Sequence, residues 1–181
     1  MIVCEGLVTE PHYFKEFRRL ERRLIELEIV PAGVPKTVVE VAVAMKKKSD
    51  EMAKQRKDEN LRYDYVWCLF DIDEHPNVED AKQQARDNSL EIAISNPCFE
   101  LWLLLHFQDQ NAHIDRNPLK HLCIKHMPGY VKTPFCDALF PNLATAIARA
   151  AKLDKRNESN SKPFANPSTG VYRLIQKIQQ L

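Results

Sequence analysis

Two aspartates, Asp71 and Asp73, end an aromatic and apolar stretch that begins at Tyr65. A continuous apolar run of this length, bounded by charge, is typical of a buried strand in a parallel sheet. Side chains alternate along a strand, so we expect both carboxylates to point to the same side. Two carboxylates held together repel each other unless a cation lies between them, which favours a divalent metal site. An ordinary acidic turn is the alternative interpretation, because Asp is common in turns.

Two glutamates are candidates for the same site. Glu5 ends a short apolar stretch, and Gly6 allows a tight turn after it. If the strands that end at Glu5 and Asp71 are neighbours, as in a doubly wound sheet, their carboxylates open into one crevice. Glu100 begins a very apolar helical segment, where it either caps the positive end of the helix or adds a further acid to the crevice. We favour the crevice, because a charge in so apolar a segment is costly unless it is paired.

The composition is that of an ordinary globular protein. The 181 residues are 44% hydrophobic and 28% charged, and the net charge of +1 gives no global attraction to nucleic acid or to membranes. The five cysteines are odd in number and mostly lie in apolar runs, which favours reduced thiols in a cytoplasmic protein. No apolar run reaches ~18 residues, so we expect no membrane contact.

Strand and helix patterns alternate over residues 1–107. This order predicts an α/β core with a doubly wound sheet of about four parallel strands, flanked by helices. The first helix begins near Thr9, and its apolar spacing places Phe17, Leu20 and Leu24 on the inner face. Residues 108–181 are expected to form a mostly helical and loop extension packed on the core. In that extension, residues 155–169 are polar and contain two prolines, so we predict a loop.

Several basic residues and histidines could contact nucleic acid. His12 lies on the first helix beside the expected crevice, and His75 follows the aspartate pair. Lys125 and Lys132 belong to a locally basic carboxyl-terminal third, which is either ordinary surface charge or a surface that gathers a polyanion. The position of His106 between Leu105 and Phe107 favours a buried core histidine whose hydrogen-bonding groups have partners.

Three long motifs, in this order, resemble the RloB-like family. They are Cys-Glu-Gly-x-x-Thr-Glu-Pro-x-Tyr-Phe at 4–14, Phe-Asp-x-Asp-Glu-His at 70–75, and Ser-Asn-Pro-Cys-Phe-Glu-Leu-Trp-Leu-Leu-Leu-His-Phe at 95–107. Asn-Pro-Ser-Thr at 166–169, before an apolar helix, resembles the end of the same family. The resemblance therefore covers nearly the whole chain.

The resemblance implies a Toprim-like fold and a role in prokaryotic phage defence. In Toprim domains, a Glu after the first strand and an Asp-x-Asp after the third hold Mg²⁺ for strand cleavage, which maps these roles onto Glu5, Asp71 and Asp73. A topoisomerase or a primase needs further modules that do not fit in 181 residues, so hydrolytic cleavage is the expected chemistry. The resemblance also implies an ATPase partner protein, and homo-oligomers are compatible with it.

The leading hypothesis is therefore a nuclease that uses Mg²⁺, or Mn²⁺ as a substitute, on RNA, including tRNA, or on DNA. Glu5 would transfer protons, Asp71 and Asp73 would bind the metal with it, and Glu100 would be an auxiliary acid. The alternative is a catalytically silent binding or regulatory module that acts with the ATPase partner. The sequence leaves the choice between RNA and DNA open.

Overall fold

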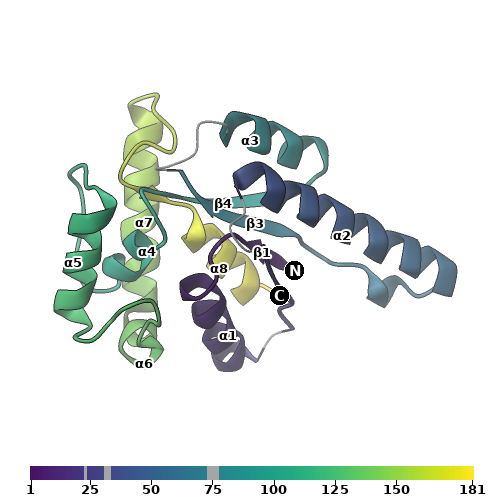
Figure 1. The fold of residues 1–181 in the computed structure, drawn as a ribbon, viewed down its shortest axis with the longest axis horizontal. Helices are drawn as coiled ribbons and strands as arrows, with labels where there is room; N and C mark the ends of the chain where they lie inside the picture. Colours follow the sequence, from purple (N-terminus) through teal and green to yellow (C-terminus); the bar gives the residue numbers. More distant parts are fainter. Residues whose placement is uncertain (23, 31–33, 73–77) are drawn as a thin grey trace.

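A mostly parallel five-stranded sheet forms the centre of the computed structural model, which describes residues 1–22, 24–30, 34–72 and 78–181 (Figure 1). The first four strands are parallel, and the fifth is antiparallel to the fourth. The spatial order is β2-β1-β3-β4-β5. The strands are β1 (Ile2–Cys4), β2 (Leu27–Ile29), β3 (Trp67–Asp71), β4 (Glu91–Asn96) and β5 (Ser168–Thr169). The predicted neighbour relation of the first and third strands is thus confirmed.

Alternation along the strands divides the core into two clusters, one on each face of the sheet. Cys68 and Phe70 of β3 pack with α2 (Pro35–Arg56) and α3 (Val78–Asp87). Trp67 and Leu69 face the other side, where α1 (Thr9–Glu21), α4 (Glu100–Leu105) and α8 (Val171–Gln179) cover the sheet. Because both faces are covered by helices, β3 is apolar at successive positions.

The chain after residue 107 adds helices to the cluster that contains Trp67 and Leu69, on the outer side of α4. Its helices are α5 (Arg116–His126), α6 (Cys136–Leu139), α7 (Leu143–Ser159) and α8, with a short 3₁₀ turn at Phe140–Asn142. Another 3₁₀ turn, at Glu59–Leu61, precedes β3. Helices α5 and α7 pack against α4. In α8, Val171, Leu174, Ile175 and Ile178 are all buried, as their helical spacing predicts.

The predicted loop at residues 155–169 is wrong at both ends. Helix α7 continues to Ser159, and Ser168 and Thr169 form β5 at the edge of the sheet. The hydroxyls of Ser95 and Thr169 lie 2.9 Å apart across the β4–β5 pair. A two-residue polar strand has no periodic pattern, so the sequence alone does not reveal it.

The first helix is shorter than its leucine spacing suggests. It ends at Glu21, and Arg22 adopts a left-handed conformation with φ of 53°. Leu20 is 53% exposed and Leu24 is fully exposed, so neither belongs to the inner face. Within the described residues, no helix is both long and apolar enough to cross a membrane.

Candidate active site at the carboxyl edge of the sheet

The carboxyl edge of the parallel strands brings Glu5 and Asp71 to neighbouring positions. Glu5 directly follows β1, and Asp71 is the last residue of β3. In the register of these two strands, Cys4 is opposite Leu69, and the Glu5 backbone N–H donates to the Leu69 carbonyl at 3.2 Å. The two acids therefore come from adjacent strands, as the doubly wound interpretation requires.

Asp71 lies on the face of the sheet that α1 and α4 cover, because it has the same strand parity as Leu69. Its side chain is only 16% exposed, and Arg116 Nη2 lies 3.4 Å from its Oδ2. Burial raises the pKa of Asp71 well above its usual value, and the charge of Glu10 adds to the rise while Arg116 opposes it. The negative charges of Glu100 and Glu5 also raise this pKa.

Glu10 is a member of this acidic group that our sequence analysis did not place at the site. It lies in the first turn of α1 and is 7% exposed. Burial raises its pKa to about 7, and the charges of Glu100 and Glu5 contribute to the rise. In the sequence, Glu10 has the pattern of an ordinary first-turn acid of a helix, so the local pattern hides its burial. Its position five residues after Glu5, in the same motif, was the available signal.

Gly6 provides the space that the Glu10 side chain occupies. A Cβ atom at residue 6 would overlap the Glu10 carboxylate. Any larger residue at position 6 would therefore force the Glu10 carboxylate to move from its place in this group. The close approach, rather than the backbone conformation, is what favours glycine here.

Glu100 joins the acids from the start of α4. Its Oε1 accepts a hydrogen bond from the Tyr130 hydroxyl at 3.2 Å. The Glu100 charge raises the pKa values of both Asp71 and Glu10. The residue therefore lies at a helix amino terminus and also interacts electrostatically with the acidic group, while its role in chemistry stays a prediction. We call Glu5, Glu10, Asp71 and Glu100 the acidic cluster.

The chain matches the sequence model of the RloB-like protein family over residues 1–178. It belongs to the RloB-like family. A search among curated proteins and a search among solved structures gave no match. All four residues of the acidic cluster, together with Arg116 and Tyr130, lie within the matched range. The mixed α/β fold of this RloB-like chain is consistent with a Toprim-like architecture.

The donor chemistry of the acidic cluster fits a hard divalent cation. Carboxylate oxygens are the protein ligands that Mg²⁺ prefers, and it needs only one or two of them beside water and substrate oxygens. Burial is the main cause of the raised pKa values of Asp71 and Glu10, and the neighbouring carboxylates add to the rise, so a bound cation would favour the charged forms of both groups. Among the described residues, no three His, Cys, Asp or Glu side chains form a group arranged to hold a metal ion. Asp73, the other predicted ligand, lies outside the described residues.

The predicted nucleic-acid contacts are dispersed. His12 is half-buried on α1, whereas Lys125 and Lys132 are exposed on α5 and in the segment after it. Lys125 is nine residues from Arg116, about half a turn around the helix axis, so the two side chains leave α5 on opposite sides. His75 lies outside the described residues.

Arg116 and His106 differ in how far the sequence revealed their positions. Arg116 is the cation that the fold brings to Asp71, and our sequence analysis did not single it out. It follows a segment without periodic pattern, so no sequence signal connects it to β3. His106 is the buried core histidine that we expected: its Nδ1 is 2.9 Å from the Trp102 carbonyl.

Proposed function

We propose that this RloB-like protein is a Mg²⁺-dependent nuclease that hydrolyses phosphodiester bonds of RNA or DNA in prokaryotic anti-phage defence. The observation that carries the proposal is the acidic cluster itself. Four carboxylates from β1, α1, β3 and α4 interact at the carboxyl edge of a doubly wound sheet, which is where such sheets bind ligands. Burying this much like charge is costly, and a metal-dependent site explains why the chain does so.

The acids divide into metal ligands and proton-transfer groups in this proposal. Glu5, Asp71 and Asp73 would hold the metal ion, which would stabilise charge on the scissile phosphate and make water a better nucleophile. Mn²⁺ would substitute for Mg²⁺ on the same oxygen ligands.

Glu10 is the stronger candidate for proton transfer, which sequence reasoning assigned to Glu5. In the metal-free cluster burial raises its pKa to about 7, and its carboxylate lies beside the proposed metal ligands without being one of them. Glu100, held by the Tyr130 hydroxyl, is an auxiliary acid that sustains the raised pKa of Glu10.

Arg116 is the candidate for substrate positioning. Its guanidinium lies beside Asp71 and is 42% exposed. A planar, permanently charged fork is suited to a phosphate oxygen pair, so the phosphodiester would be drawn to the cluster from the α5 side.

The test is a cleavage assay on three substrates: tRNA, single-stranded DNA and plasmid DNA. We expect product with Mg²⁺ or Mn²⁺ and none with EDTA. Asp71→Asn and Asp73→Asn should abolish it, whereas the exposed-surface control Glu40→Gln on α2 should cleave normally. If a folded Asp71→Asn variant gives as much product as the wild type, the nuclease proposal is wrong.

A catalytically silent module that acts with an ATPase partner is the second candidate. The observation that favours it is the lack, within the described residues, of three side chains grouped for a metal. A phage-challenge assay separates the two functions. If the protein is a silent module, the Asp71→Asn variant should protect cells as well as the wild type does. If it is a nuclease, the variant should lose protection.

A further inference from the structure

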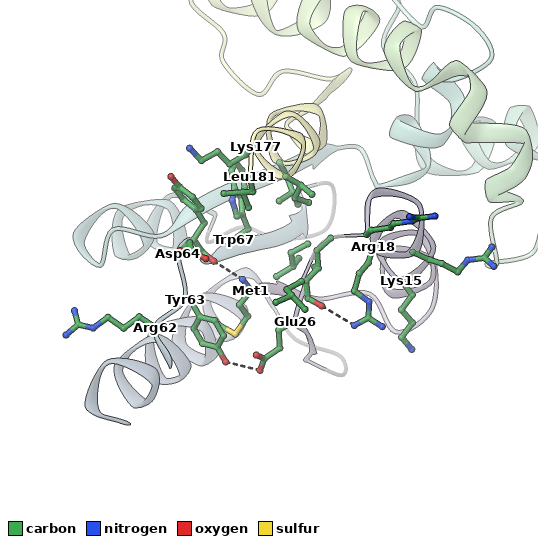
Figure 2. Close-up of a pocket in the computed structure, with 18 of the residues that line it drawn as sticks. Met1, Lys15, Arg18, Glu26, Arg62, Tyr63, Asp64, Trp67, Lys177 and Leu181 are labelled. Atoms are coloured by element: carbon green, nitrogen blue, oxygen red, sulfur yellow. Dashed lines mark hydrogen bonds between the residues drawn. The ribbon is translucent and has the colours of Figure 1, made fainter. Parts of the chain in front are cut away.

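A concave surface lies at the amino edge of the sheet, away from the acidic cluster. A pocket of about 960 Å³ opens there between α1 and α8, with the first residues of β1 and β3 at its base (Figure 2). Trp67, at the base, precedes Asp71 by four strand residues, or about 13 Å. The base is largely apolar and consists of Ile2, Ile25, Trp67, Leu174 and Ile178.

Cations predominate around this pocket. The described lining residues include six basic side chains, namely Lys15, Arg18, Arg19, Arg22, Arg62 and Lys177, and three acidic ones, namely Glu16, Glu26 and Asp64. Two ion pairs reduce this charge: Arg19 is 2.8 Å from Glu16, and Arg62 is 2.9 Å from Glu59, which lies outside the lining. Glu26 accepts a hydrogen bond from Tyr63 at 2.8 Å. The lining still has more basic than acidic side chains, in a protein whose net charge is only +1.

Aromatic side chains lie next to these cations. Tyr65 is 36% exposed, and the Lys177 ammonium lies 4.0 Å from the centre of its ring. Trp67 contributes a second ring to the base. Figure 2 shows Lys177 on α8 on one side of the pocket and Lys15 and Arg18 on α1 on the other. A planar base and a phosphate would each find a matching surface here.

We propose that this amino-edge pocket binds a nucleoside phosphate. The base packs on the apolar floor beside Trp67 and Tyr65, and the phosphates bind the cations of α1 and α8. The volume lies within the range of about 300–1,000 Å³ that is usual for small-ligand sites. A free nucleotide and the end of a nucleic-acid strand share this chemistry. The proposal does not depend on nuclease activity, because the pocket shares no residue with the acidic cluster.

Tryptophan fluorescence provides a direct measurement. The chain has two tryptophans, and only Trp67 lines the pocket, so we expect a ligand-induced change in emission to report Trp67. The probes are ATP, inorganic pyrophosphate and a short single-stranded oligonucleotide, each added to the full chain in EDTA so that no cleavage occurs. We expect ATP or the oligonucleotide to bind saturably with a change in emission. Trp67→Phe should remove the signal while calorimetry still detects binding.

The three probes identify the source of the ligand. Tighter binding of ATP indicates a free nucleotide, and tighter binding of the oligonucleotide indicates a strand end; either result supports the pocket. Pyrophosphate should bind more weakly, because it lacks the base. Equal binding of pyrophosphate, or saturable binding by none of the probes, overturns the proposal.

Charge reversal tests the location. Lys15→Glu and Lys177→Glu should each weaken binding by at least about tenfold, since each removes a charge-assisted contact and adds repulsion. Lys54→Glu, an exposed lysine of α2 outside the pocket, is the matched control and should leave affinity unchanged. Equal weakening by all three variants would mean general attraction of anions to surface charge and would overturn the proposal. Loss of binding in Asp71→Asn alone would do so as well, because the ligand would then occupy the acidic cluster.

Discussion

The two edges of the same sheet carry opposite charge. The carboxyl edge gathers Glu5, Glu10, Asp71 and Glu100, whereas the amino edge has a pocket with six basic side chains against three acidic ones. Helix α1 contributes to both, because it runs back from the carboxyl edge to the amino edge: Glu10 lies in its first turn and Arg18 in its last. This distribution follows the helix dipole, which favours acids at the amino end and bases at the carboxyl end.

The comparison shows that charge sign and burial together distinguish the two surfaces. At the carboxyl edge, Glu10 and Asp71 are held in little solvent, so their charges interact strongly. At the amino edge, Lys15 and Arg22 are exposed, so their charges are screened and available to a ligand. We expect the first surface to act in catalysis and the second in binding.

Changing Glu10 should have the largest effect. Glu10→Gln keeps the shape of the side chain but cannot transfer a proton, so we expect cleavage to slow by about 100-fold or more. Single-turnover rates across pH 5 to 9 measure this, and the variant should also lose any inflection near neutral pH. Glu40→Gln on α2 is the matched control. A variant that retains wild-type rates would remove Glu10 from the catalytic edge.

Acidic pH should lower the stability of the fold through His106, which packs against α1, the helix that contributes to both edges. His106 packs against Tyr13 of α1, and burial lowers its pKa from 6.5 to about 4. Between these values the unfolded chain binds the proton and the folded chain does not, so stability falls as pH decreases from 6.5 toward 4. The free energy of unfolding should decrease by about 3 kcal/mol over this range.

Urea unfolding at several pH values checks this expectation. His106→Asn keeps a donor near the Trp102 carbonyl but does not titrate. The variant should be less stable than the wild type at pH 7 and should lose less stability between pH 6.5 and 4. Parallel pH profiles for the two proteins would contradict the assignment.

Filling the space at Gly6 should disturb only the carboxyl edge. Gly6→Ala places a methyl group against the Glu10 carboxylate, and we expect a cost of about 1–3 kcal/mol from overpacking. The cost should shrink in a Glu10→Ala background, because the colliding group is absent. A double-mutant cycle by urea unfolding measures this coupling. Additive effects would show that the two residues do not share one space.

The smallest expected effect is stabilisation by ligands, which should distinguish the two edges. At ten times its Kd, a ligand adds about 1.4 kcal/mol, which is a rise in Tm of about 3–6 °C for a chain of this size. We expect Mg²⁺ to give this rise in the wild type and not in Asp71→Asn. ATP in EDTA should stabilise Asp71→Asn normally but Lys15→Glu much less, because its affinity is at least about tenfold weaker. Thermal scans of these proteins provide the measurement, and one variant that abolishes both shifts would mean that the sites are not independent.

Much of the fold could be predicted because its signals are local. The apolar run before Asp71 and the alternation of strands and helices predicted a parallel sheet, and parallel strands necessarily align their carboxyl ends. That alignment predicted a shared edge for Glu5 and Asp71, and the pairing of β1 with β3, which the sequence left as a condition, put them on adjacent strands. Leu24 shows the limit of this reasoning, since its helical spacing suggested burial and the structure exposes it.

The sequence by itself determined that acids follow the first and third strands, that these acids share one edge of the sheet, and to which family the chain belongs. Only the tertiary structure decided that Glu10 is buried among these acids, that Arg116 reaches Asp71, and that α1 and α8 leave a basic pocket between them. The physical reason is separation along the chain. Arg116 and Asp71 are 45 residues apart, and their contact depends on how α5 packs on α4, which no local pattern encodes.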